Sequence, residues 1–306
     1  MSVSNNMTKD QGIHLSQNTI KRDMLVRKLG KIGFYFNPIF SYFFLWAPIL
    51  ILVLFSFNNS RSVSNFTGFT FDWYTNIFNN VMGAESAFST TLMLESLGNS
   101  LKVSLATTLI STTIGTMVAL GIARGNFPGK RILEGVLFLP IVIPEITQGV
   151  SLAVFFNIVF TWWNDLTGIR ILPGFHTIII AHVAFTISFV AVVVRARLSD
   201  MNPRYEEAAR DLGANEWKTF WRITFPLILP GIIAGALLAF TLSLDDFVVT
   251  FFTAGVGTST LPIFVYGLLK LSVTPEINAI STIMLVISTV LISVSLGFQG
   301  RNATKV

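Results

Sequence analysis

The chain has 306 residues, of which 52% are hydrophobic and only 12% are charged. A typical soluble domain carries about 25% charged residues, so this composition argues against a water-soluble enzyme and for a membrane protein. There are no cysteines, which excludes disulfides, cysteine-ligated zinc, iron–sulfur clusters and a cysteine nucleophile. The net charge of +5 raises the question of which side of a membrane the basic residues face, and it needs no nucleic-acid partner.

Six apolar stretches are long enough to cross a bilayer as helices, which takes about 20 residues each. The third stretch is interrupted by Pro140, Pro144 and Glu145, and neighbouring helices can satisfy the backbone groups that such prolines free. The sequence therefore predicts an all-α membrane protein. The expected spans cover residues 39–57, 103–123, 132–160, 176–194, 225–252 and 277–298.

The basic residues predict the orientation of these spans. All but four of the 21 lysines and arginines lie before the first span, between spans two and three, between spans four and five, or after span six. Cytoplasmic loops carry the excess of basic residues, so both termini are expected in the cytoplasm. We expect a cytoplasmic tail over residues 1–37, a six-helix membrane domain over 38–300 and a second tail over 301–306. The first apolar stretch is too long for a signal-peptide core and is not followed by an A-x-A site.

Two loops have a composition of their own. Residues 58–96 are expected outside the cell, with a short surface helix within residues 66–78. The cytoplasmic loop 196–225 is far more charged than the rest of the chain. In it, Pro203 and Gly213 bracket a short helix that carries acidic residues in its first turn. Asn215 can cap a second helix over residues 216–223.

This loop has an apolar face and a charged face. It could simply pack under the membrane helices. However, Glu207-Ala208-Ala209 is followed at fixed spacing by Gly213, by Ile223 and by Phe225-Pro226. The pattern resembles the EAA signature of bacterial ABC importer permeases, E-A-A-x3-G-x9-I-x-L-P, with Phe225 in place of leucine. The residues expected in the apolar face are Leu212, Trp217, Phe220 and Trp221.

The resemblance implies the type I ABC importer permease fold and a coupling helix that docks on a separate ATPase subunit. The coupling residues that it implies are Glu207, Ala208, Ala209, Arg210, Asp211 and Gly213. ATP and Mg²⁺ would be bound by that partner, because the stretch Gly125–Arg131 lacks the glycine spacing and the Ser/Thr of a nucleotide-binding loop. No cofactor, metal site or catalytic residue is expected in this chain, whose three histidines are dispersed.

Three carboxylates fall inside the expected spans, namely Glu145, Asp245 and Asp246. A charged side chain at the centre of a span costs about 2.5 to 3.5 kcal/mol, so each one prompts a functional hypothesis. They could hydrogen-bond to neighbours such as Gln148 or Ser243, or they could line an anionic cavity for a cationic solute. Adjacent residues of a helix point about 100° apart, so only one aspartate is expected to face such a cavity fully.

The stretch Leu242–Val249, with its S-L-D-D segment, is similar to permeases for spermidine and putrescine, as are residues 68–74 and 273–279. Glu145 stands where that family is expected to have aspartate. The resemblance implies import of a polyamine with a periplasmic or lipoprotein binding protein, a second homologous permease and two ATPase copies. Aromatic rings suit such cations. The aromatic candidates for the solute path are Trp162, Phe247 and Tyr266.

Two alternatives are left open by the residues. The first is an ABC permease for another small cationic or neutral solute. An anion importer would aim basic groups at its cavity, and no span has a lysine or arginine in its middle. The second is an intramembrane aspartyl protease, but its two aspartates would have to face each other from two helices. Asp245 and Asp246 are neighbours on one helix.

Overall fold

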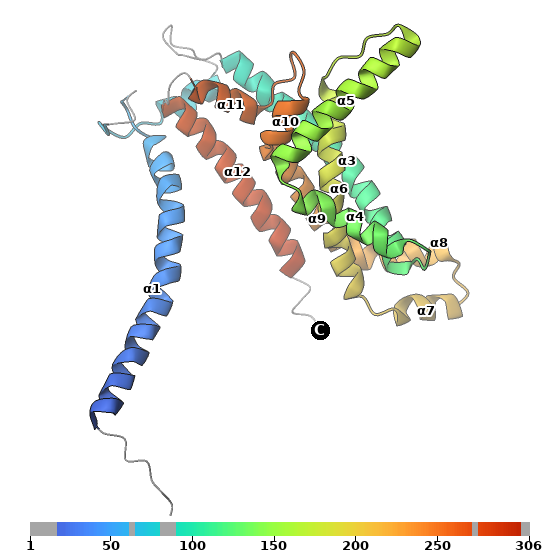
Figure 1. The fold of residues 1–306 in the computed structure, drawn as a ribbon, viewed down its shortest axis with the longest axis horizontal. Coiled ribbons are helices and arrows are strands. Elements are labelled where there is room, and N and C mark those ends of the chain that lie inside the picture. The colour runs from blue at the N-terminus through green and yellow to red at the C-terminus, as the bar shows by residue number, and fades with distance from the viewer. Residues whose placement is uncertain (1–16, 61–64, 80–89, 271–274, 301–306) are drawn as a thin grey trace, which may run out of the picture. The chain divides into compact units, whose positions relative to one another are not determined.

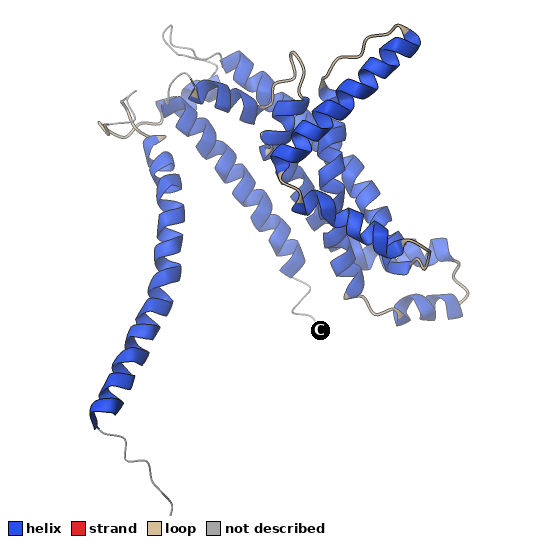
Figure 2. Ribbon diagram, viewed as in Figure 1, coloured by secondary structure: helices blue, strands red, loops and turns tan. Residues whose placement is uncertain are grey.

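The computed structural model describes residues 17–60, 65–79, 90–270 and 275–300 (Figure 1). Within these ranges the regular structure is helical apart from one isolated bridge between Asn58 and Phe69 (Figure 2). The chain divides after Leu54 into an N-terminal unit and a second unit that holds the other helices. The helices are α1 (Gln17–Phe55), α2 (Asp72–Asn79), α3 (Thr90–Arg124), α4 (Lys130–Val142), α5 (Glu145–Thr167), α6 (Phe175–Ser199), α7 (Arg204–Asp211), α8 (Glu216–Thr219), the π-helical turn η1 (Phe220–Thr224), α9 (Phe225–Asp245), α10 (Val248–Thr253), α11 (Leu261–Leu269) and α12 (Pro275–Gly300).

Six helical stretches are long and apolar enough to cross a membrane, in agreement with the sequence analysis. They lie in α1, α3, α5, α6, the continuous run from α8 to α9, and α12. Of the expected N-terminal tail, residues 1–16 lie outside the described residues and the rest form the first part of α1. The apolar stretch of α1, Phe34–Phe55, has no buried residue in its most hydrophobic window. Its exposed rings are suited to a hydrocarbon environment.

The centre of the second unit is formed by α3, α6 and α9, which pack on one another. A small residue permits the close approach of α3 and α6, because a Cβ atom added to Gly115 would lie 2.8 Å from Cβ of Val190. Membrane helices commonly use glycine for such contacts. The buried apolar residues of this core are Ala119, Val190, Ala191, Val194, Leu198, Met201, Ile228 and Ala239.

A smaller cluster joins α2, α3, α11 and α12 around Met93, Leu261 and Ile280. The helix expected within residues 66–78 is α2. The indole of Trp73 on this helix donates a hydrogen bond to the carbonyl of Asn58 at 2.7 Å. The segment that follows α1 is therefore held to α2 by polar as well as apolar contacts.

Two expected spans are each divided by a break in the helix. Residues 132–160 form α4 and α5, and residues 225–252 form α9 and α10. Pro140 lies inside α4, whereas Ile143 is extended because it precedes Pro144, and a residue before proline is disfavoured in the helical region. Gln148 donates to the carbonyls of Pro140 and Ile143 at 2.7 and 2.8 Å. The first break thus has its own polar support, and Glu145 begins a helix instead of lying within one.

The second helix of the charged loop differs from the expectation. Residues 216–223 were expected to form a separate helix that ends before Pro226, but α8 runs through η1 directly into α9. In the π-helical turn the N–H of Phe225 bonds the carbonyl of Phe220, five residues back. Pro226 falls in the first turn of α9. Within this continuous run the proline removes one backbone donor directly after the π-helical turn.

Candidate functional site

The three carboxylates predicted at membrane depth line one cavity of about 430 Å³. Glu145 comes from the start of α5, Asp245 is the last residue of α9, and Asp246 lies in the link to α10. Both aspartates border the cavity, but Asp245 is exposed whereas the side chain of Asp246 is only 6% exposed, which agrees with the expectation that one of them would face the cavity fully. Asp246 is extended and ends α9. The other lining residues are Pro140, Ile141, Ile143, Gln148, Phe185, Phe189, Thr241, Leu242, Phe247, Val248, Val249 and Ile292.

Asp245 is exposed at the end of α9, and its Oδ2 accepts a hydrogen bond of 2.7 Å from the hydroxyl of Ser288 on α12. Asp245 and Phe247 also line a second cavity of about 360 Å³, together with Tyr266 and Ser288. This carboxylate therefore forms part of the wall that the two cavities share. Among the described residues, Glu145 makes no side-chain hydrogen bond or ion pair, and it is exposed to the first cavity.

Two of the three expected aromatic residues lie at these cavities. The ring centroids of Phe247 and Tyr266 are 4.5 Å apart, and the Lys270 ammonium lies 4.7 Å from the centroid of the Tyr266 ring. Trp162 does not join them. Its side chain is 62% exposed, and at 1.5 Å per residue it lies about 25 Å along α5 from Glu145.

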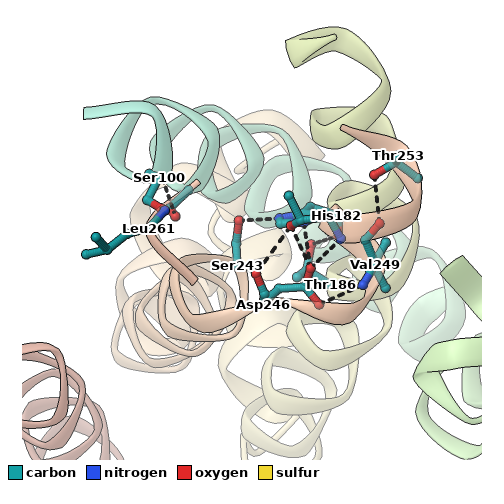
Figure 3. Close-up of polar contacts among 10 residues, drawn as sticks. Ser100, His182, Thr186, Ser243, Asp246, Val249, Thr253 and Leu261 are labelled. Atoms are coloured by element: carbon teal, nitrogen blue, oxygen red, sulfur yellow. Dashed lines mark hydrogen bonds and ion pairs between the residues drawn. The ribbon is translucent and has the colours of Figure 1, made fainter. Parts of the chain in front are cut away.

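Asp246 is held in a buried polar network (Figure 3). Its Oδ2 lies 2.7 Å from the N–H nitrogen and from the hydroxyl of Thr250, and 3.2 Å from Nε2 of His182. Its Oδ1 accepts from the N–H of Val249 at 3.3 Å. The carboxylate thus accepts hydrogen bonds from two backbone N–H groups in the first turn of α10, and this local bonding competes with continuation of α9. For Asp246, therefore, the alternative holds in which the carboxylate hydrogen-bonds to neighbouring residues.

Sequence reasoning did not assign His182, Thr250 or Ser288 to the surroundings of the carboxylates. His182 on α6 makes a helix–helix hydrogen bond of 2.7 Å to Ser243 on α9. Its place beside Asp246 had no signal in the sequence, because the two residues are far apart along the chain. A further cavity of about 460 Å³ lies along α5 and is lined by Arg170 and by no carboxylate.

The charged loop forms a second candidate site. The turn after α7 has Gly213 at φ +81°, and its N–H bonds the carbonyl of Arg210 at 2.8 Å while that of Ala214 bonds the carbonyl of Ala209 at 3.0 Å. This is the Schellman arrangement, in which glycine is preferred for its left-handed backbone. The side chain of Asn215 accepts from the N–H of Lys218 at 2.9 Å, so the predicted cap of α8 is confirmed.

The glutamate that anchors α7 is Glu206, which the motif did not single out. Its Oε1 is 2.9 Å from Nη2 of Arg124 at the end of α3 and accepts 2.7 Å from the hydroxyl of Thr224. Glu206 is buried, whereas Glu207, Ala208, Arg210 and Asp211 are exposed, as is Gly213. Burial on one face of α7 therefore leaves most of the expected coupling residues free to meet another subunit. Of the expected apolar face, Leu212 is 90%, Trp217 69% and Trp221 47% exposed, and Phe220 is half-buried.

Comparison with known proteins places the chain in a family. A family model described as the inner membrane component of binding-protein-dependent transport systems matches residues 111–306. The chain is 37% identical over 254 residues to the spermidine/putrescine transport system permease protein PotC of Haemophilus influenzae, covering 83% of this chain and 91% of PotC. It is 37% identical over 246 residues to the putrescine transport system permease protein PotI of Escherichia coli K12, covering 79% of this chain and 82% of PotI.

A solved structure shows the fold. The chain matches the crystal structure of a bacterial ABC transporter involved in the import of the acidic polysaccharide alginate, with a TM-score of 0.65 and 20% identity over 94% of this chain and 99% of that chain. Identity at that level bears on the fold alone. With six membrane-crossing stretches and the family match over the greater part of its length, the chain belongs to the inner-membrane permeases of binding-protein-dependent transport systems, and it is a multi-pass transport subunit with the ABC importer permease fold and not an enzyme.

Proposed function

We propose that this chain is the permease subunit of an ATP-driven importer that moves a polyamine, spermidine or putrescine, across the cytoplasmic membrane by alternating access. The observation that carries the proposal is the cavity in which Glu145, Asp245 and Asp246 come together. The named functions of PotC and PotI supply the solute class.

The chemistry of the cavity matches that of a polyamine. Such a solute carries several ammonium groups on a methylene chain, so it needs carboxylates spaced along an apolar wall. Glu145 and Asp245 supply charge that is exposed to the cavity, and Phe185, Phe189 and Phe247 supply aromatic wall. Cation–π contacts contribute about 0.5 to 2 kcal/mol each. Tyr266 extends this surface into the neighbouring cavity, which shares Asp245.

The remaining subunits follow from the same proposal. A binding protein delivers the polyamine, a second homologous permease completes the pathway, and two ATPase copies bind ATP and Mg²⁺. The exposed face of α7, with Glu207, Arg210 and Asp211, meets one ATPase together with Leu212 and Gly213 in the turn that follows. This requires the loop between α6 and α9, and both termini, to lie in the cytoplasm. The basic residues of the loop support that orientation.

The absence of native cysteines permits a direct test of the cavity. In the assembled complex in lipid nanodiscs, Leu242→Cys would be labelled with cationic and anionic methanethiosulfonate reagents of equal size. We expect the cationic reagent to react at least tenfold faster, because carboxylates in a low-dielectric cavity concentrate cations. The preference should shrink when Asp245→Asn and Glu145→Gln are added, and spermidine should protect the thiol.

The matched control is Ala153→Cys, which lies in the cavity lined by Arg170 and should show no preference for the cationic reagent. Equal rates of both reagents at Leu242→Cys would refute the anionic cavity. A cation preference without protection by spermidine or putrescine would refute the polyamine and favour another small cation. Uptake of labelled spermidine into liposomes that hold the complete complex then tests transport itself.

A further inference from the structure

His182 is a buried titratable group whose role is not covered by the solute path. Its side chain is fully buried on α6, and its two ring nitrogens contact three other segments of the chain (Figure 3). Nδ1 lies 2.7 Å from the hydroxyl of Ser243 on α9. Nε2 lies 2.9 Å from the hydroxyl of Thr250 on α10 and 3.2 Å from Oδ2 of Asp246 in the link between α9 and α10.

The hydrogen bonds form one consistent chain. The Thr250 hydroxyl donates to Asp246 Oδ2 at 2.7 Å, so its oxygen can accept from Nε2–H of His182. The Ser243 hydroxyl then donates to Nδ1. A neutral imidazole with its proton on Nε2 therefore satisfies every member of the network. In a helix bundle within lipid no water replaces a lost partner at such a position, so each bond of the network matters for the local structure.

These contacts stabilise a helix that is too short to be stable by itself. α10 has six residues, and a helix of that length is marginal without tertiary contacts. At its start it is held by His182 and Asp246. At its end the carbonyl of Thr253 accepts 2.7 Å from the hydroxyl of Thr177, also on α6. Between them Val249 packs against Ala181 and Phe156.

The same short segment forms a wall of the acidic cavity. Phe247, Val248 and Val249 line it, next to Asp245 and Asp246. A shift of α10 away from α6 would carry the Phe247 ring with it and would change the shape of both cavities that this ring lines. The position of the wall therefore depends on the bonds that hold α10.

We propose that His182 is a positioning residue for solute movement: through Asp246 and Thr250 it fixes α10 against α6 and so sets the wall of the acidic cavity. The residue does not touch the cavity itself. Its effect on transport, which rests on the proposed function, is exerted by positioning Phe247 and the two aspartates.

The cysteine-free chain again supplies the test. Val249 borders the acidic cavity but is only 1% exposed, so a thiol at Val249→Cys should react slowly with a small maleimide in the complex in nanodiscs. In the His182→Leu background, which keeps the bulk and removes both hydrogen bonds, we expect the labelling rate to rise at least tenfold. His182→Gln can place an amide N–H near the position of Nε2 and should restore protection. His182→Asn can replace only the hydrogen bond to Ser243, so it should not restore protection of the thiol.

Val194→Cys, buried in the core of α3, α6 and α9, distinguishes a local from a general loosening. The proposal predicts that this thiol stays protected in His182→Leu. If both thiols become reactive, His182 serves general stability and the proposal is wrong. If Val249→Cys stays protected in His182→Leu, the proposal is also wrong.

The transport readout is the amount of spermidine moved per ATP hydrolysed in liposomes. His182→Leu should lower this ratio at least fivefold while basal ATP hydrolysis stays within twofold, and His182→Gln should recover it. An unchanged ratio would overturn the positioning role. Because maleimide labelling involves no solute, failure of the polyamine assignment would leave the labelling result intact and would be recognised separately.

Discussion

Two adjacent aspartates have different environments, although the sequence presents them as a pair. Among the described residues, only the Ser288 hydroxyl donates a hydrogen bond to Asp245, which is exposed. Asp246 uses both carboxylate oxygens for Val249, Thr250 and His182. An amide has only one acceptor oxygen. Replacement by asparagine is therefore conservative at Asp245 and disruptive at Asp246.

Asp245→Asn should reduce polyamine uptake about tenfold, the size of one lost charge contact in a partly hydrated cavity, or about 1.4 kcal/mol. The amide oxygen can still accept from Ser288, so the free energy of unfolding should change by no more than about 0.5 kcal/mol. Uptake into liposomes and thermal unfolding of the purified complex measure the two quantities. Wild-type uptake by this variant and by Glu145→Gln would show that these carboxylates do not belong to the solute path.

Asp246→Asn should destabilise the complex by about 1 to 3 kcal/mol, because the amide leaves at least one buried donor among its partners unsatisfied. The comparison is with Asp245→Asn, measured by the same denaturation of the complex in detergent. Equal stability of the two variants would show that the Asp246 network contributes nothing to the fold. Thr250→Val, which removes one hydroxyl from the same network, should lower stability by a smaller amount.

At the scale of elements, α7 is attached on one face and open on the other. Glu206 binds Arg124 and Thr224 on the attached face. Glu207 and Leu212 are exposed on the open part of the loop, and Gly213 permits the turn into α8 with a positive φ that other residues adopt at a penalty. The short helix is thus attached to the membrane domain on one side, and its free face is available to another subunit.

Glu207→Lys or Gly213→Asp should uncouple this short helix from the ATPase. The first reverses an exposed charge, and the second forces a side chain into the left-handed region at a cost of about 1 to 2 kcal/mol. We expect severalfold loss of uptake and of solute-stimulated ATP hydrolysis, with normal insertion of the chain. Gly121→Ala is the matched control, since a Cβ atom there meets open space in a helix. Intact uptake in both variants would refute the coupling role.

At the scale of the whole molecule, the six stretches that are long and apolar enough to cross a membrane predict that the two termini lie on the same side. The basic residues predict that this side is the cytoplasm. A reporter fused after Val306 that is active only in the cytoplasm should therefore be active, and the same reporter inserted within residues 65–71 should be inactive. The opposite pattern would invert the orientation and would place α7 on the wrong side for an ATPase.

Local features of the chain were predictable from the sequence because they depend on residues close together along it. Length and apolarity predicted the six membrane-crossing stretches, and the spacing around Gly213 and Asn215 predicted the turn and cap between α7 and α8. The motif spacing also indicated the transport family. The grouping of Glu145 with Asp245 and Asp246 followed only from their location inside the expected spans, and the structure places them at one cavity.

The break in span three follows from Pro144, because the residue before a proline is disfavoured in the helical region. The division of span five and the separate roles of the two aspartates were decided by tertiary structure, because they depend on partners from other helices. Gln148 supports the break before α5, and His182 meets Asp246 only because α6 packs beside α10. The burial of Glu206, and not Glu207, follows likewise from contact with the end of α3. The sequence by itself therefore determined the family, the six membrane-crossing stretches and the turn and cap of the charged loop, whereas the packing of the helices decided which polar side chains meet.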